Sequence, residues 1–239
     1  MAGMYSKLKK AAVVIIAALL SAAPVFAGDH FFPTKKGMVQ LTANLNEKGR
    51  VEAYNRLTVK DVKGSGGDMT VVYAVEVLDR HHKPVGKAGA REYSVKIAGG
   101  VLEFELKNMM DAFFAAKGMT YELTAGKLRI PSNMAAGSRI EDSWMNMTVK
   151  VPIIGEVTAD VKMTDMRCTG VETVTVGAGT FEAYKVVSTS TTNTKGWGKP
   201  VIVNRGTTWY ARGIGAVKSV NIDEKGKVES SSELRELVR

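Results

Sequence analysis

Apolar and polar residues alternate with a period of two along most of the chain after residue 38. Met145, Met147 and Val149, for example, fall on one face of an extended chain, with Asn146 and Thr148 on the other. Side chains of a strand point alternately to its two faces, so this pattern predicts strands with one buried and one solvent-facing side. Sheets with one wet face are antiparallel, because parallel sheets are covered on both faces. We therefore predict a mainly β protein, built as an antiparallel curved sheet or open barrel-like β fold with one short helix.

Short turns rich in Asn, Asp and Gly separate the predicted strands. Asn46 and Asp223 each stand three residues before a glycine, Gly49 and Gly226, in segments that are near copies of each other. This spacing fits a type I turn closed by a glycine in the left-handed conformation. The segment 79–84 also reads as a hairpin turn.

One segment departs from the alternation and predicts the helix. Asn108 stands where it can cap a helix over residues 109–117, and Gly118 stands where it can end that helix. Apolar residues surround the segment, so we expect it to be buried or to lie across a sheet face. The last residues, from Glu229 onward, fit either a final strand or a short helix.

The first 27 residues have the three parts of a secretory signal peptide. Three lysines precede an apolar run from Ala11 to Leu20, and small residues up to Ala27 mark a cleavage site. The run is about ten residues, half of what a bilayer crossing needs; an uncleaved anchor helix is the alternative. We predict a mature chain of residues 28–239, without a transmembrane span, in the periplasm or cell envelope.

The mature chain contains no linker or low-complexity tract. It is predicted to be a single β-rich domain with a candidate joint at residues 131–137; a pair of small β domains is the alternative. The formal net charge of +9 falls to +6 without the signal segment, which carries three lysines and no acid. Because the basic residues are scattered, they predict a solvated surface rather than nucleic-acid binding.

No set of residues forms a recognisable catalytic or metal site. Of the three histidines, His30 is expected at a mobile terminus, and the neighbours His81 and His82 point to opposite faces of an extended chain. Zinc needs three or four converging ligands, so we predict no metal and no cofactor. The lone cysteine, Cys168, stands in apolar company and is predicted to be a buried, inert thiol.

An enzyme is therefore not expected, and one catalytic alternative stays open. Glu103 and Glu105 are two residues apart and can share a strand face, and Glu141 and Asp142 follow later in the chain. Paired carboxylates of this kind serve glycosidases, so a hydrolase acting on an envelope polymer is the alternative function.

Methionines and aromatic residues gather in the middle of the chain and suggest binding. Methionine packs adaptably and suits surfaces that accept varied apolar ligands, although ordinary core filling is the alternative. Ile153 and Ile154, in an apolar turn, are candidates for a partner contact, or else pack on a neighbouring strand. The prediction is a binding or assembly module for an apolar small molecule or an envelope partner protein. The candidate ligand-binding residues are Met109, Phe113, Phe114, Trp144, Met145 and Met147.

The carboxy-terminal half, Val171–Val186 followed by Thr208–Ser219, resembles the TapB-like group of exported bacterial proteins of unknown function. The hairpin Asp223–Lys227 and the opening Phe32–Gly37 fit as well, so the likeness spans most of the mature chain. Its motifs are structural: glycine turns, an aromatic strand and a hairpin. The resemblance implies an all-β envelope protein with no assigned catalytic residues. His82 departs from it, because such a hairpin often has glycine there.

Overall fold

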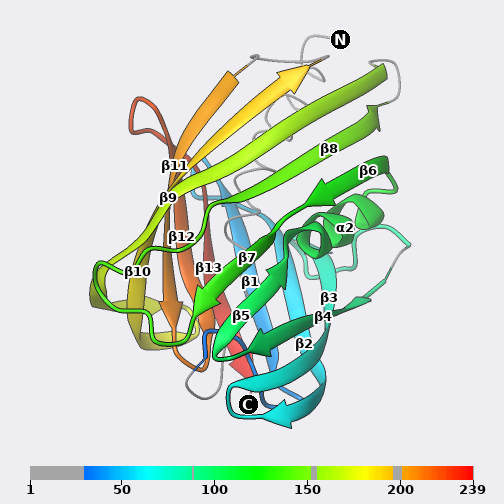
Figure 1. Cartoon of the computed structure of the whole chain (residues 1–239). Helices are drawn as coiled ribbons and strands as arrows, with labels where there is room; N and C mark the ends of the chain where they lie inside the picture. Colours follow the sequence, from blue (N-terminus) through cyan, green and yellow to red (C-terminus); the bar gives the residue numbers. More distant parts are fainter. Residues whose placement is uncertain (1–29, 88, 152–154, 196–200, 239) are drawn as a thin grey trace.

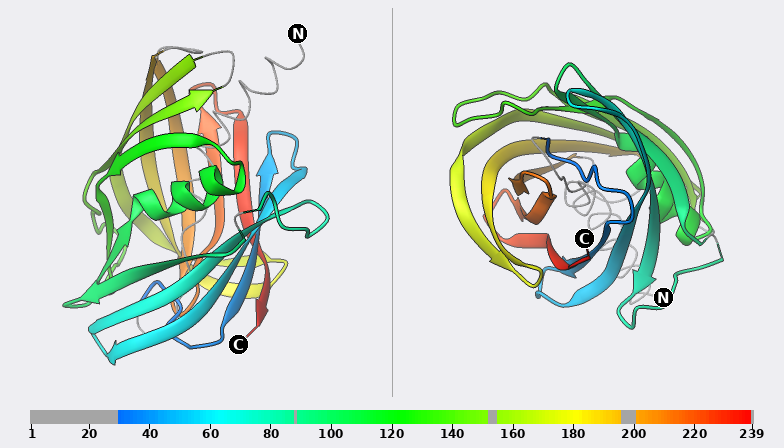
Figure 2. Two further views of the ribbon diagram at one scale, coloured as in Figure 1. Left: turned by 90° about the vertical axis from the view of Figure 1, so that its right-hand side faces the viewer. Right: turned by 90° about the horizontal axis from the view of Figure 1, so that it is seen from below.

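The computed structural model of the protein describes residues 30–87, 89–151, 155–195 and 201–238. Within these ranges the chain forms thirteen strands and one helix, and the strands join in a single antiparallel sheet (Figure 1). The sheet curls into a nearly closed barrel (Figure 2). This confirms the predicted fold class. The predicted signal peptide, residues 1–27, lies outside the described residues, as do Ile153 and Ile154.

The sheet runs in the order β6-β8-β9-β10-β11-β12-β13-β1-β2-β3-β4-β5-β7. The pairing of β13 with β1 places the last strand of the chain beside the first. The undecided end of the chain is thus a strand, β13. The candidate joint at 131–137 begins at the last residue of β7 and runs into the connection to β8, and the single-domain assignment stays a prediction. The elements are β1 (Val39–Asn46), β2 (Val51–Ser65), β3 (Asp68–Asp79), β4 (Arg91–Ala98), β5 (Val101–Glu105), α2 (Leu106–Ala116), β6 (Thr120–Ala125), β7 (Lys127–Pro131), β8 (Ser143–Val151), β9 (Gly155–Val176), β10 (Gly179–Lys195), β11 (Val201–Ala211), β12 (Gly215–Asp223) and β13 (Val228–Val238).

One stretch of chain brings the two edges of the sheet together. β6 pairs with β8 at one edge, and β7, which follows after Gly126 alone, pairs with β5 at the other. The Gly126 amide donates to the Trp144 carbonyl at 2.9 Å. A Cβ on Gly126 would lie 3.2 Å from Trp144 Nε1, so the crossing leaves little room for a side chain. The sheet therefore closes through this stretch.

Three hairpins share one turn design, as the sequence predicts for two of them. Asn46 Oδ1 accepts hydrogen bonds from the amides two and four residues later, and the Oδ1 atoms of Asp223 and Asp79 do the same. The residue that closes each turn has a positive φ, which is +69° for Gly49 and +79° for Gly226. In the third hairpin His82 takes this conformation, with φ of +62°. The predicted turn type is thus present even where histidine replaces glycine.

The helix α2 begins three residues earlier than predicted. Asn108 lies inside its first turn and is not the cap; Glu105 takes that position without a side-chain cap bond. Because Leu106 is buried directly after β5, burial rather than capping decides where the helix starts. The Asn108 side chain instead hydrogen-bonds to Tyr73 of β3. Gly118 ends the helix as predicted, since its φ is +62° and its amide donates to a carbonyl of the last turn.

The start of the described chain is buried in the large core at the lower end of the barrel. Phe31 stands edge-on to Tyr184 at 5.0 Å between ring centroids, and Phe32 stands edge-on to Tyr73 at 5.1 Å. Figure 2 shows this segment, in dark blue, crossing the inside of the ring of strands. The expectation of a mobile His30 is therefore wrong, because the two phenylalanines anchor it and its Nε2 lies 2.7 Å from the Gly66 carbonyl oxygen. Cys168 is a buried free thiol in this core, as predicted.

Candidate functional site

A second apolar cluster, separate from the large core, lies where α2 packs against the sheet. Met110 and Phe114, four residues apart, lie on one face of α2 and are buried. Met145 and Met147 oppose them from β8, because alternation places both on the inward face of that strand. We refer to this contact as the α2 cluster. Its buried members are Met110, Phe114, Met145, Met147, Val149, Ala159 and Val161.

The structure brings only some of the predicted ligand-binding residues together. Phe114, Met145 and Met147 belong to the α2 cluster, and the half-buried Phe113 packs against it. Trp144 is 46% exposed, because it alternates with Met145 along β8 and faces outward. Met109 belongs to α2, but its side chain lies outside the described parts. That these residues bind a ligand stays a prediction.

A polar contact ties α2 to the strands on both of its sides. Asp111 of α2 accepts a hydrogen bond from the Tyr93 hydroxyl of β4 at 2.7 Å and another from the Tyr121 hydroxyl of β6. Arg91 of β4 forms an ion pair with the same carboxylate, with 2.7 Å between Nε and Oδ2. We refer to these four residues as the Asp111 clasp. The clasp joins β4 to β6 through the helix, although the two strands do not pair with each other.

The surroundings of the clasp fix its protonation states. Burial alone would raise the pKa of Asp111, but the two tyrosine hydroxyls and the positive charge of Arg91 outweigh it, so the pKa lies below its usual value. Burial, and then the hydrogen bond to the Asp111 carboxylate, raise the pKa of Tyr121 to about 12. The same causes raise the pKa of Tyr93. At neutral pH the clasp therefore holds a carboxylate between two neutral phenols.

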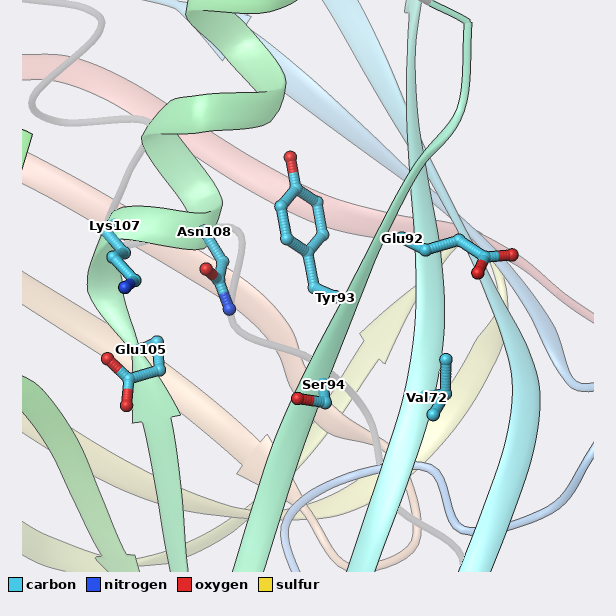
Figure 3. Close-up of a pocket in the computed structure, with 7 residues that line it drawn as sticks. All are labelled: Val72, Glu92, Tyr93, Ser94, Glu105, Lys107 and Asn108. Atoms are coloured by element: carbon cyan, nitrogen blue, oxygen red, sulfur yellow. The ribbon is translucent and has the colours of Figure 1, made fainter.

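An open polar cavity of about 480 Å3 lies beside the clasp. Figure 3 shows Tyr93 and Asn108 facing the space between α2 and β4, while Glu92 points away from the helix. Because acidic, basic and neutral groups mix in its wall, the cavity offers no single charge to a ligand. The other lining residues are Val72, Ser94, Glu105 and Lys107.

The sequence profile of the family described as DUF3108-like matches residues 35–234, from before β1 into β13. The chain belongs to the DUF3108-like family. No curated protein matches it. Membership confirms the coarser part of the expected resemblance, an all-β family without an assigned activity, whereas the TapB-like assignment stays a prediction.

Two solved structures share the fold of this DUF3108-like chain. One is a "putative lipoprotein" from Parabacteroides distasonis ATCC 8503, with a TM-score of 0.71 and 20% identity, covering 87% of this chain and 98% of the other. The second is a "putative exported protein with YmcC-like fold" from Bacteroides fragilis NCTC 9343, with a TM-score of 0.70 and 20% identity, covering 91% and 100%. At this identity the likeness establishes the fold.

Three of the four carboxylates of the hydrolase alternative form ion pairs in this DUF3108-like protein. Glu103 accepts hydrogen bonds from Lys127 at 2.9 Å and Arg129 at 3.1 Å, which lower its pKa. Arg129 also bonds to Glu141, whose side chain is 69% exposed. A glycosidase needs one carboxylic acid with a raised pKa, and Glu103 is shifted in the opposite direction. Asp142 is exposed as well, and Glu105 pairs with Lys127 at 3.4 Å.

The remaining candidate chemistry is equally dispersed. His81 and His82 lie exposed in their turn, and His82 stacks on Tyr54 with 4.3 Å between ring centroids. Among the described residues of this DUF3108-like chain, no group of three His, Cys, Asp or Glu residues is placed to hold a metal ion. Nor do those residues include a helix with the length and apolar character to cross a bilayer.

Sequence reasoning missed the Asp111 clasp. Its partners come from β4 and β6, and no local pattern joins them. One signal was present: Asp111 is the only charged residue in the apolar run from Met109 to Ala116. A charged residue in such a run requires a partner when the helix is packed against a sheet.

Proposed function

We propose that this DUF3108-like protein is exported to the cell envelope and acts there as a non-catalytic binding module for an apolar ligand held between α2 and the sheet. The observation that carries the proposal is the α2 cluster, a methionine-rich contact separate from the large core. Export is supported by the pattern of the first 27 residues and by the descriptions of both structural neighbours.

The α2 cluster suits a ligand because it can open without breaking the sheet. The helix contributes no backbone hydrogen bonds to the thirteen-stranded ladder, and it is held by side-chain packing and by the Asp111 clasp. Elements held in this way open at a lower free energy than strands in the middle of a sheet. Methionine side chains have three rotatable bonds and can repack around apolar ligands of different shape.

A partner protein is the second candidate, and one observation favours it. β7 is the last strand of the sheet and pairs only with β5 among the described strands. An edge of this kind can accept a strand from another chain. The hydrolase alternative has no comparable support.

Native mass spectrometry of the protein purified from its own host tests both candidates. We expect a copurifying apolar molecule, whereas a copurifying protein would favour the partner candidate. The fluorescent apolar probe N-phenyl-1-naphthylamine then tests the location. We expect Met147→Ala to change its Kd about fivefold, whereas the control Met166→Ala, a buried methionine of the large core, leaves the Kd unchanged. A monomer that carries neither an apolar molecule nor a partner protein, and that does not bind the probe, would refute the proposal.

A further inference from the structure

The inner face of the barrel changes from apolar to polar between β9 and β10. On β9, Ala159 and Val161 belong to the α2 cluster; opposite them on β10 stand Thr194 and Thr192. From β10 through β13 the buried inward side chains of the upper half are mainly hydroxyls and amides. We refer to this surface as the polar wall. Its buried members are Ser190, Thr192, Asn204, Thr208, Ser219, Asn221, Ser230 and Ser232.

Cross-strand pairs make the polar wall continuous. Across β12 and β13, Ser219 stands opposite Ser232 and Asn221 stands opposite Ser230. The hydroxyl oxygens of the first pair are 3.0 Å apart, and Asn221 Nδ2 donates to Ser230 Oγ at 3.3 Å. Below these rows the wall gives way to apolar groups such as Leu234, which belong to the large core. The wall thus has an apolar border below it and another at β9.

The buried members of the polar wall carry no charge. Among the described residues, the buried polar side chains include no Asp, Glu, Lys or Arg. The cations of these strands face outward, where Lys185 and Lys218 lie 5.5 and 5.4 Å from the ring centre of Trp209. An acid, the half-buried Asp223, stands beside the wall opposite Asn204 at the end of β12, and its carboxylate accepts hydrogen bonds from the amides of its own turn.

One acceptor of the polar wall has no partner. Asn204 is 5% exposed and stands on β11 opposite Ser190 of β10. Within the described parts of the chain, no group donates a hydrogen bond to its Oδ1. A buried acceptor without a donor is costly, so natural proteins rarely keep one unless water, an ion or a ligand supplies the donor. This atom therefore points to a hydrogen-bonding guest on the polar wall.

We infer that the polar wall binds a neutral, hydroxyl-rich group of the sugar type, carried by an amphiphile whose apolar chain lies at the α2 cluster; this rests on the proposed function. Serine, threonine and asparagine each offer donors and acceptors, which match sugar hydroxyls. A phosphate or carboxylate would lose its water there without a cation to pair with. The border between β9 and β10 places polar and apolar surfaces next to each other, as one amphiphile requires.

Three amphiphiles with twelve-carbon chains, used below their micelle concentrations, test the inference: dodecyl maltoside, dodecylphosphocholine and dodecanoate. Calorimetric titration of the full mature protein is expected to show dodecyl maltoside binding about tenfold more tightly than the other two. The Asn204→Leu variant should weaken maltoside binding about fivefold and leave dodecanoate binding unchanged. Because it removes the unpartnered acceptor, its thermal stability should not fall.

Two further variants keep the test decisive. Ser190→Ala replaces Asn204→Leu if the latter does not fold, with the same expected loss of maltoside affinity. Ser143→Ala is the matched control, since Ser143 is a buried serine on β8, outside the polar wall. It should leave all three affinities unchanged.

Each outcome separates this inference from the proposed function. Equal affinities for the three amphiphiles, or tightest binding of dodecanoate, would overturn the inference and leave the proposed function standing. Binding of none would overturn both. If maltose binds as tightly as dodecyl maltoside and Asn204→Leu weakens its binding, the result would support sugar binding at the polar wall. It would rule out a contribution of the apolar chain.

Discussion

The Tyr93 hydroxyl of β4 donates a hydrogen bond to Asp111 Oδ2 at 2.7 Å and so ties the helix to the sheet. Tyr121 holds the same carboxylate from β6. The barrel is therefore joined in two ways across this side: covalently through the chain that crosses at Gly126, and non-covalently through Asp111. Only the second connection can open and close reversibly.

Replacing Asp111 by Asn should loosen α2. The variant keeps the shape of the side chain but loses the charge that pairs with Arg91 and strengthens both tyrosine hydrogen bonds. Hydrogen bonds to charged groups contribute about 1.5–3 kcal/mol each, so we expect the free energy of unfolding to fall by about 1–3 kcal/mol in urea titrations. Asp142→Asn is the control, since Asp142 is exposed. Equal effects of the two substitutions would contradict a role for the clasp.

The contribution of the clasp should depend on pH. The pKa of Asp111 in the folded protein lies below the ordinary 3.8, so the unfolded chain takes up a proton at higher pH than the folded protein does. The stabilisation is therefore complete above the unfolded pKa and is lost as pH falls through the folded pKa. We expect the stability difference between wild type and Asp111→Asn to be constant from about pH 7 to 5 and to shrink below about pH 4. A difference that shrinks near pH 6 instead would implicate another group.

Phe32 should be one of the most sensitive positions of the large core. Its side chain is 0% exposed and packs edge-on against Tyr73. Truncating a buried phenylalanine costs about 3–5 kcal/mol, so Phe32→Ala should lower the unfolding midpoint strongly in urea. Phe32→Leu retains most of the side-chain volume and should lower the unfolding midpoint much less. Similar, small losses for both variants would mean that the segment is not anchored at this position.

The hairpin at His82 offers a test of backbone strain. His82 has φ of +62° and stacks on Tyr54. His82→Ala and His82→Gly both remove the stacked ring, but alanine keeps the strained conformation and glycine relieves it. Glycine should therefore be the more stable of the two by about 1 kcal/mol in thermal or urea unfolding. Equal stabilities would show that the turn relaxes when the ring is removed.

Alternation of apolar and polar residues was sufficient to predict the antiparallel barrel-like sheet, and the Asn46 and Asp223 turns followed from local spacing. The helix start was wrong because Asn108 satisfies a capping rule that burial of Leu106 overrides. Asp111 and its partners could not be found, since they lie on elements far apart in sequence.

The polar wall could not be predicted for a different reason. On β13, Ser230, Ser231 and Ser232 are polar at consecutive positions, so polarity does not indicate which of them point inward. Closure of the sheet decides this, and it places Ser230 and Ser232 inside. The general rule that polar residues face water was thus insufficient for this part of the barrel.

The stretch from Thr120 to Pro131 contributes a strand to each edge of the sheet, and so it links the two edges covalently. A barrel closed in this way keeps its circumference even when single hydrogen bonds between strands break and re-form. The proposed apolar ligand would therefore enter from an end of the barrel or beneath a displaced α2, because the strands cannot part at this crossing. An insertion of a few residues at Gly126 would lengthen this crossing and let the two edges of the sheet move apart.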